Sequence, residues 1–78
     1  MRIFSIHAQW DPEAQVWVAT SEDVPGLATE AESVDALFEK LRVIVPELLE
    51  ANGIVPNHPD EIPIELLAHR QEQFRARM

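Results

Sequence analysis

Apolar residues recur every three or four positions between Ser33 and Gly53, and no other pattern in the chain is as strong. On a helix these residues would share one face, and the charged residues between them would face water. The apolar positions are Val34, Leu37, Phe38, Leu41, Ile44, Val45, Leu48 and Leu49. Ser33 stands at the expected N-cap, and Asn52-Gly53 is a stop signal because glycine readily takes the left-handed conformation. The pattern predicts one long amphipathic helix that continues through Pro46 with a kink.

Two segments before this helix have the patterns of strands. Residues 2–10 alternate, and the positions on their apolar face are Phe4, Ile6, Ala8 and Trp10. Residues 16–20 are apolar on both faces, which is typical of a strand inside a sheet. Trp17 and Ala19 share one face of this strand, and Val16 and Val18 share the other. We favour the phase with Trp17 in the core, while the opposite phase, with Trp17 on an open sheet face, is left open by the sequence.

Turn residues separate the strands and set where the remaining strands begin. Residues 11–14 have turn chemistry, and Pro25-Gly26 suits the central positions of a type II turn. Residues 27–31 are then predicted as a short third strand. After the helix, alternation predicts a fourth strand over residues 61–67, and Pro63 places this strand at a sheet edge because proline cannot donate to a ladder.

These elements predict the fold class α+β, a two-layer β-β-β-α-β domain with one long helix on one face of a mixed four-stranded sheet. Three antiparallel strands followed by a helix return the chain parallel to the first strand. A right-handed crossover then places the fourth strand beside the first, which gives the strand order 3-2-1-4. We assign residues 1–68 to this domain and residues 69–78 to a polar, basic C-terminal tail, frayed or in a short helix.

Composition and charge narrow the classes of function. The 78 residues fit one domain, and a domain this small is marginally stable alone, so we expect a homodimer. A net charge of −8, from 14 acidic and 6 basic residues, disfavours direct binding of nucleic acid and suits a partner with a basic surface. Without cysteine there is no disulfide and no thiolate nucleophile. No apolar segment is long enough to cross a membrane, so we expect no membrane association and a cytoplasmic protein.

No set of residues in the sequence predicts an active site. The three histidines, His7, His58 and His69, lack the spacing of a helical metal pair. The two glycines cannot form a phosphate-binding loop. We therefore expect no catalytic residue, no cofactor, no metal and no enzyme activity.

Carboxylates at strand ends are instead the candidates for contacting a partner. Asp11 and Glu13 lie in the first turn, and Glu22 and Asp23 lie in the second, where they would steer a basic protein. Trp17 would add an aromatic contact if it lies on the open sheet face. The exposed face of the helix is an alternative surface, and the sequence does not choose between the two. The carboxylates of that helix face are Glu39, Glu47 and Glu50.

Short motifs spread over nearly the whole chain match a known pattern. They are WDPEA at 10–14, VWVATSEDVPGL at 16–27, TEA at 29–31, KLR at 40–42, PELLE at 46–50, NG at 52–53 and IPIEL at 62–66. With them the chain resembles a family of short uncharacterised bacterial proteins that is grouped with the HicB-like antitoxins. The strand–Asp-x-Pro-Gly–strand–helix arrangement, here Asp23 to Gly26, is similar to the N-terminal domain of HicB. The resemblance implies half of an RNase H fold, self-association, and binding of a small basic RNase toxin, HicA.

Two departures from these relatives change the expected function. HicB proteins usually carry a C-terminal DNA-binding domain, for which residues 69–78 are too short, so we expect no operator binding. RNase H enzymes have an acidic residue in the first strand, where this chain has Ser5, His7 and Gln9. We therefore predict a non-catalytic protein-interaction domain that resembles a HicB antitoxin and binds a small basic protein, a HicA-like RNase toxin. The alternatives are a degraded RNase H-type metal-dependent nuclease, and a homodimer with no separable activity.

Overall fold

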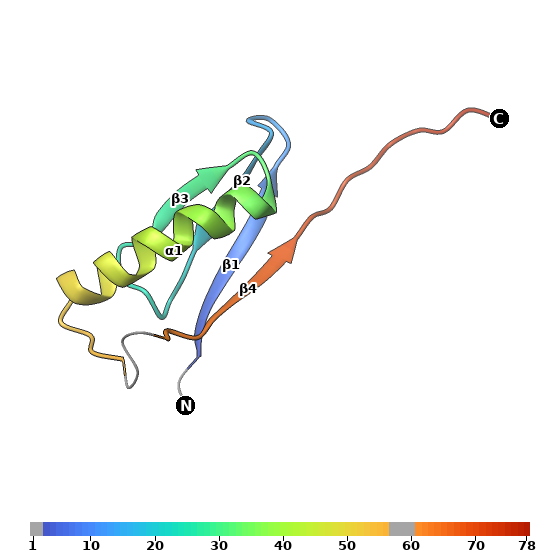
Figure 1. The fold of residues 1–78 in the computed structure, drawn as a ribbon. Helices are drawn as coiled ribbons and strands as arrows, with labels where there is room; N and C mark the ends of the chain where they lie inside the picture. Colours follow the sequence, from blue (N-terminus) through green and yellow to red (C-terminus); the bar gives the residue numbers. More distant parts are fainter. Residues whose placement is uncertain (1–2, 57–60) are drawn as a thin grey trace.

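A helix lies across one face of a four-stranded sheet in the computed structural model, which describes residues 3–56 and 61–78 (Figure 1). Within these residues the elements, in chain order, are β1 (Phe4–Asp11), β2 (Val16–Thr20), β3 (Ala28–Ala31), α1 (Val34–Ala51) and β4 (Ile64–His69). The strand order is β3-β2-β1-β4, with β1 antiparallel to β2 and parallel to β4. The predicted α+β class, element order and strand order are confirmed.

On β1 and on β2, every second side chain faces α1. Phe4, Ile6 and Ala8 are buried, as predicted for the apolar face of β1. The register pairs Ala8 with Ala19 and Trp10 with Trp17, so the side chains of β2 that face α1 are Ala19 and Trp17. Ala19 is fully buried and Trp17 packs against the core from a half-buried position. The favoured phase of β2 is therefore confirmed, and Val16 and Val18 lie on the open face of the sheet.

The buried face of α1 is a single row of side chains spaced four residues apart. Leu37, Leu41, Val45 and Leu49 are each 1% exposed or less. They pack in one cluster with the apolar face of β1 and with Val24 from the turn before β3. Burying a side chain of this size stabilises the fold by about 1.5–3 kcal/mol, so this row is the main attachment of helix to sheet.

Both ends of α1 are closed by local hydrogen bonds, which is why the helix begins and ends where the sequence predicts. At the start, the Ser33 hydroxyl accepts the backbone N–H of Ala36 (3.0 Å). At the end, Gly53 has a φ of +68°, its N–H donates to the carbonyl of Glu50 (3.1 Å), and the Ile54 N–H donates to the carbonyl of Leu49 (2.9 Å). This pair of bonds is a Schellman motif, which satisfies carbonyls that the helix cannot.

The side chain of Asn52 connects the end of α1 to the turn between β2 and β3. Its amide donates to the carbonyls of Leu48 (2.8 Å) and Pro25 (3.2 Å). In that turn the Leu27 N–H donates to the carbonyl of Val24 (3.2 Å) and Gly26 has a φ of +82°, as a type II turn requires. Within the described residues, no helix is both long and apolar enough to span a bilayer.

The boundaries of three strands differ from the prediction. β1 runs one residue further than predicted, to Asp11, and Arg2 lies outside the described residues. β3 begins at Ala28 because the N–H of the preceding Leu27 is used in the turn. β4 covers residues 64–69 rather than 61–67, since it pairs with β1 in parallel register from Phe4–Ile64 to Gln9–His69.

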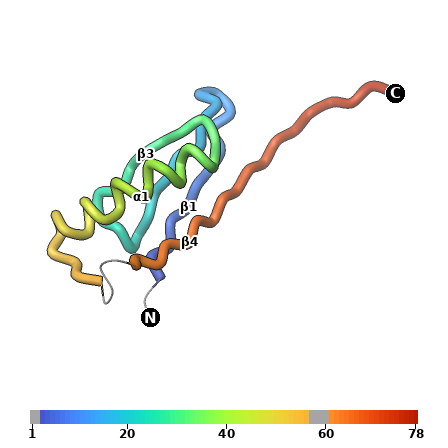
Figure 2. The backbone as a smooth tube through the Cα atoms, viewed as in Figure 1, coloured from blue at the N-terminus to red at the C-terminus, as the bar shows by residue number. Residues whose placement is uncertain are grey.

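The helix and the tail complete the comparison with the sequence. α1 is continuous through Pro46, as the unbroken apolar phase predicts. The segment after β4 is extended rather than helical, and it leaves the body of the molecule (Figure 2). Its first residue is Arg70, one residue later than predicted, because His69 still belongs to β4. His58 lies outside the described residues.

The buried row of α1 predicts the size of a stability change. Leu41→Ala is expected to lower the free energy of unfolding by about 2–5 kcal/mol, through lost burial and a residual cavity. Urea-induced unfolding measures this loss. The matched control is Val43→Ala on the outer face of α1, where the side chain is 60% exposed and a change within about 0.5 kcal/mol is expected. Overlapping unfolding curves for Leu41→Ala and the parent would show that the helix phase is wrong.

Candidate functional site

α1 lies over one half of the sheet and leaves the other half only partly covered. It packs mainly over β2 and β3, and β4 lies on the far side of β1 from them (Figure 1). Ile64 and Leu66 of β4 share a face with Phe4 and Ile6, because they are their partners in the parallel register. They are nevertheless only half buried, whereas Phe4 and Ile6 are fully buried. An apolar strip is therefore accessible between α1 and β4.

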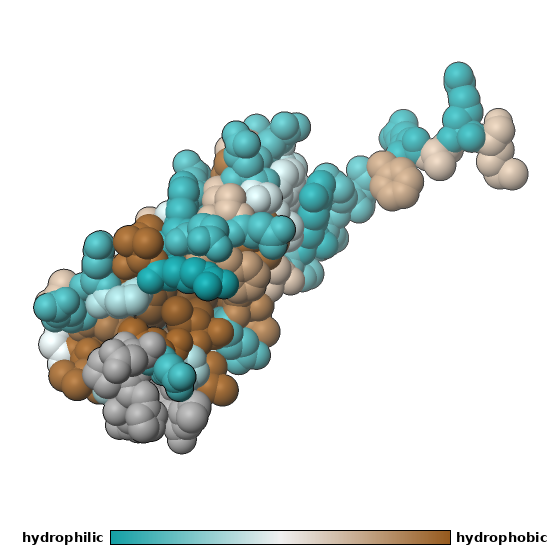
Figure 3. All heavy atoms as spheres, in the orientation of Figure 1, coloured by the Kyte–Doolittle hydropathy of each residue, from teal (hydrophilic) through white to brown (hydrophobic). Residues whose placement is uncertain are grey.

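This strip forms a depression that we call the α1–β4 groove. A hollow of about 300 Å³ lies between the helix and the strand, and it is lined by Phe38, Leu41, Arg42, Ile62 and Ile64. Phe38 is 39% exposed, so an aromatic ring is available on the wall of the hollow. Figure 3 shows hydrophobic side chains gathered on this face of the molecule, with hydrophilic side chains around them.

A second hollow, of about 330 Å³, continues the groove towards the end of α1. It shares Ile62 with the first hollow. Its other lining residues are Pro46, Leu49, Glu50, Gly53, Ile54, Val55 and Pro56. Because the two hollows share Ile62 and follow α1 from Phe38 to Gly53, the groove is elongated, which suits an extended peptide segment better than a compact small molecule.

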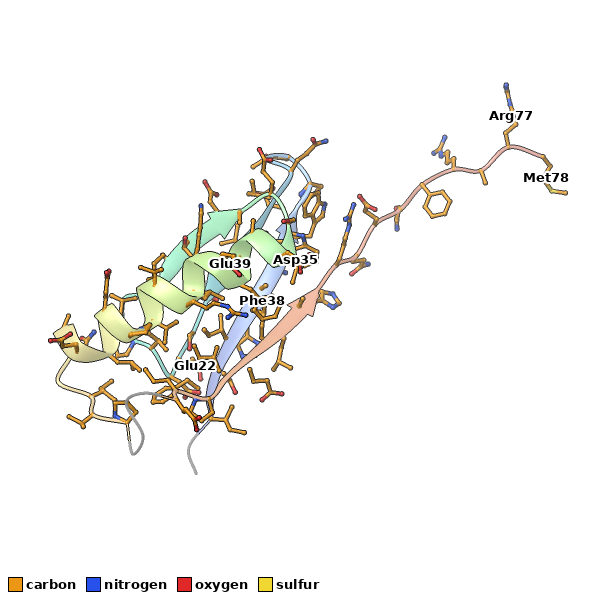
Figure 4. All side chains as sticks on the ribbon, in the orientation of Figure 1. Glu22, Asp35, Phe38, Glu39, Arg77 and Met78 are labelled. Carbon is orange, nitrogen blue, oxygen red and sulfur yellow. The ribbon has the colours of Figure 1, made fainter. Side chains whose placement is uncertain are left out.

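Carboxylates border the groove along the helix. Glu50 lines the second hollow. Asp35 and Glu39 line neither hollow but lie on α1 one turn before Phe38 and Arg42 respectively, and Figure 4 shows both carboxylates near Phe38. Arg42 is the basic residue of the lining, and its Nε lies 3.7 Å from Oε1 of Glu39. Both side chains of this pair are exposed, so the ion pair is weak and readily exchanged for another. The border of the groove is thus net acidic.

The four turn carboxylates predicted to contact a partner are not brought together. β1 and β2 are antiparallel, so the turn with Asp11 and Glu13 and the turn with Glu22 and Asp23 lie at opposite ends of the sheet. Within the first turn, Oδ1 of Asp11 accepts the backbone N–H groups of Glu13 (3.0 Å) and Ala14 (3.3 Å). Asp11 therefore holds the shape of its own turn, and the expected cluster of four carboxylates does not form.

Asp23 also has a structural role, and a more central one. Its Oδ2 accepts the backbone N–H of Ser5 at 2.8 Å, across to β1. Beside it, the Ser21 hydroxyl donates to the carbonyl of Ser5 (2.6 Å) and accepts the backbone N–H groups of Asp23 (3.0 Å) and Val24 (3.2 Å). These bonds tie the turn before β3 to the start of β1. Of the four predicted carboxylates, Glu13 and Glu22 are exposed, whereas Asp11 and Asp23 are half-buried.

Trp17 belongs to an aromatic cluster on the helix side of the sheet, not to the open face. The rings of Trp10 and Trp17 meet edge to face with centroids 5.6 Å apart, and the Arg70 guanidinium lies 4.2 Å from the centre of the Trp10 ring. Arg70 also bonds Glu72 at 2.8 Å. Nε1 of Trp10 is buried and has no hydrogen-bond partner within the described residues. The cluster anchors the first residue of the tail to the body.

The open face of the sheet, opposite α1, combines polar and apolar side chains. Its exposed positions on β1 are His7 and Gln9, beside Thr20 of β2 and Leu67 of β4. No group of three or more His, Asp or Glu side chains that could hold a metal ion occurs in residues 3–56 and 61–78. This face therefore carries apolar area at Val16, Val18 and Leu67, and its described residues form no cluster of metal ligands.

Sequence reasoning missed the groove, although a signal for it was present. Phe38 was assigned to the core-facing stripe of the helix with Leu37 and Leu41. The stripe is wider than the row of four that is buried, and a residue at its margin is covered only if sheet lies beneath it. The margin of the stripe thus marked the groove, but the lateral position of the helix on the sheet was needed to recognise it.

Comparison with known proteins places the chain near proteins without an assigned function. A family model described as a domain of unknown function (DUF1902) matches residues 3–77. A search of curated proteins gives no match. Among solved structures, the chain is similar to the hypothetical protein TTHA1013 of the extremely thermophilic bacterium Thermus thermophilus. The two are 48% identical with a TM-score of 0.72, over 96% of this chain and 100% of the other. The expected likeness to short uncharacterised proteins is confirmed, and no link to HicB is seen.

The role of Asp23 in holding β1 predicts a loss of stability. Asp23→Ala removes the acceptor of the Ser5 N–H, and leaving a partly buried donor unpaired is expected to cost about 1–3 kcal/mol. Glu22→Ala is the matched control, since Glu22 is exposed, and a change within about 0.5 kcal/mol is expected. Chemical unfolding of both variants measures the difference. Equal losses for the two variants would contradict the structural role of Asp23.

Proposed function

The chain belongs to the DUF1902 family, whose function is unknown, and we propose that it is a non-catalytic protein-interaction domain that binds a small basic protein. The observation that carries this proposal is the α1–β4 groove, an apolar depression with an acidic border. The net charge of −8 extends the same preference over the whole molecule. A basic segment with an apolar or aromatic residue has the chemistry to fill this site.

The two parts of the groove act on different steps of binding. Removal of exposed apolar surface such as Phe38 from water stabilises the complex, and aromatic side chains in such positions often dominate the binding energy. The carboxylates Glu39 and Glu50 attract a basic partner from a distance and so increase the rate of encounter. We therefore assign affinity mainly to the apolar floor and association rate mainly to the acidic border.

The helix-side surface is preferred over the turn carboxylates as the site of contact. Glu39 and Glu50, two of the three carboxylates of the helix face, border the groove, whereas Asp11 and Asp23 are engaged by backbone N–H groups. Glu13 and Glu22 are left to contribute to long-range attraction from opposite ends of the sheet.

The sequence resemblance to HicB antitoxins supports a HicA-like RNase toxin as the basic partner. The matched family and the Thermus thermophilus protein carry no assigned function, so this identity rests on the resemblance alone. An RNase of this kind acts on RNA in the cytoplasm, and we place the protein in the same compartment. The degraded-nuclease alternative gains no support from the described residues, where no group of carboxylates converges.

Capture and binding kinetics test this function. The tagged protein is used to recover partners from a lysate of its own organism, and each recovered small basic protein is then purified and measured by surface-immobilised kinetics at several salt concentrations. For the true partner, the double variant Glu39→Gln/Glu50→Gln is expected to lower the association rate several-fold and to flatten its dependence on salt. Phe38→Ser is expected instead to increase the dissociation rate.

The control for charge is Glu13→Gln/Glu30→Gln, which removes the same two charges from the first turn and from the far edge strand β3. Its association rate is expected to stay close to that of the parent. Equal effects of the two double variants would show that net charge, rather than the groove, attracts the partner. Recovery of no basic protein that binds the purified chain would overturn the proposed function.

A further inference from the structure

The tail, residues 70–78, has no partner of its own beyond its first three residues. It is extended and points away from the sheet, so that Arg77 and Met78 lie far from the body (Figure 4). Within the described residues, no hydrogen bond or ion pair is formed by residues 73–78. Phe74, a large apolar side chain in the middle of the tail, is 86% exposed. A basic segment with an exposed aromatic side chain and no contacts of its own has the chemistry to bind an apolar surface bordered by carboxylates.

The charges of the tail and of the body are opposite. The tail has three arginines and one glutamate, which gives +2. Since the whole chain carries −8, the remaining residues carry −10. The order of side chains in the tail, Phe74 followed by Arg75 and Arg77, is that of an apolar anchor followed by basic residues. This is the chemistry that the α1–β4 groove and its acidic border fit.

The tail of one chain is directed away from the groove of the same chain. β4 starts at Ile64, which lines the groove, and runs to His69, and the next residue, Arg70, lies at the Trp10–Trp17 cluster. To enter its own groove the tail would have to reverse direction directly after Arg70. A second copy removes this difficulty, because its groove can be placed in the line of the tail.

The outer edge of β4 provides the means to place it. β4 is the last strand of the sheet order, so one of its two edges is not paired within the described residues. Edge strands readily pair with another chain, and a two-fold axis makes that pairing antiparallel. Antiparallel pairing along this edge carries each tail towards the start of the partner's β4, where the groove lies. With the two His69 residues opposite each other, residues 70–74 of one copy run along residues 68–64 of the other, and at about 3.3 Å per residue Phe74 lies roughly 17 Å beyond His69, level with Ile64 of the other copy.

We propose that two copies of the chain pair through β4 and exchange their tails, so that each tail occupies the α1–β4 groove of the other copy. Phe74 fills the hollow beside Phe38, and Arg75 and Arg77 lie against the acidic border with Glu39 and Glu50. The family match supports the tail as a working part of the domain, since it extends to residue 77. The inference rests on the proposed function in taking the groove as a binding surface, and it adds that a basic partner must displace the tail to enter.

Charge exchange between tail and groove gives the sharpest test. One variant reverses the tail, Arg75→Glu/Arg77→Glu, and a second reverses the border, Glu39→Lys/Glu50→Lys. Each alone brings like charges together in both exchange contacts, so the Kd of its dimer is expected to be about tenfold or more above that of the parent. In a heterodimer of the two variants, the acidic tail of the first meets the basic border of the second, and the basic tail of the second meets the acidic border of the first. Both exchange contacts then bring opposite charges together. An equimolar mixture is therefore expected to form a heterodimer with a Kd below that of either variant alone, as sedimentation velocity of the two separately labelled variants would show.

Apolar variants test the anchor with matched controls. Phe74→Ser and a chain that ends at Glu72, which retains the Arg70 contacts, are both expected to raise the Kd of the dimer by about tenfold or more. Val43→Ser removes a similarly exposed apolar side chain from the outer face of α1 and is expected to leave the Kd unchanged. Unfolding curves of all variants exclude loss of fold as the cause.

The outcomes separate the exchange from the proposed function. A parent that stays monomeric at high micromolar concentration, or a mixture that pairs no better than the two charge variants alone, would overturn the exchange. None of these measurements uses a foreign partner, so they stand even if no basic protein is found. Conversely, if the chain that ends at Glu72 binds a recovered partner no faster than the parent does, displacement of the tail is refuted while the proposed function remains.

Discussion

A helix is too narrow to cover four strands, and this constraint determines the architecture of the molecule. Four strands spaced about 4.8 Å apart extend over about 14 Å between the outer strand axes, whereas a helix is about 10 Å wide. The buried row of α1, from Leu37 to Leu49, packs where it covers Phe4, Ile6 and the apolar side chains of β2 and β3. The remaining width falls at β4, and the α1–β4 groove is the result. This accessible apolar depression is thus a consequence of the packing that holds the protein together.

The sequence predicted those features that depend on local periodicity and chain direction. The helix was predicted because the 3.6-residue pattern from Val34 to Leu49 is long and both caps are strong, and the strand order followed from the crossover rule. The phase of β2 stayed open because both of its faces are apolar, and the register with β1 was required to decide it. Features that depend on the lateral position of α1 over the sheet, or on the register between strands, could not be predicted. Phe38 could not be recognised as a groove residue, and the ends of β4 could not be placed without its pairing to β1.

The turn carboxylates show that residues at equivalent places in the sequence pattern, such as strand ends, need not lie on the same surface. Asp11 and Asp23 were grouped because both lie at strand ends, but a hairpin separates its two ends by the full length of a strand. Both were assumed free, although acids in turns often accept backbone N–H groups of their own or adjacent segments. At Asp23 the acceptor role extends to β1, so the acid joins two strands as well as shaping a turn. The helix carboxylates Glu39 and Glu50, spaced along one element, are the ones placed beside apolar surface.

The aromatic cluster at the end of the sheet gives the protein an intrinsic optical reporter. The chain has two tryptophans, and both belong to the edge-to-face pair of Trp10 and Trp17. The Arg70 guanidinium lies over the Trp10 ring at the residue where the tail begins, so the environment of the pair depends on the attachment of the tail to the body. Fluorescence of the unlabelled protein is consequently expected to change when Arg70 leaves the Trp10 ring, and would report detachment of the tail at its first residue.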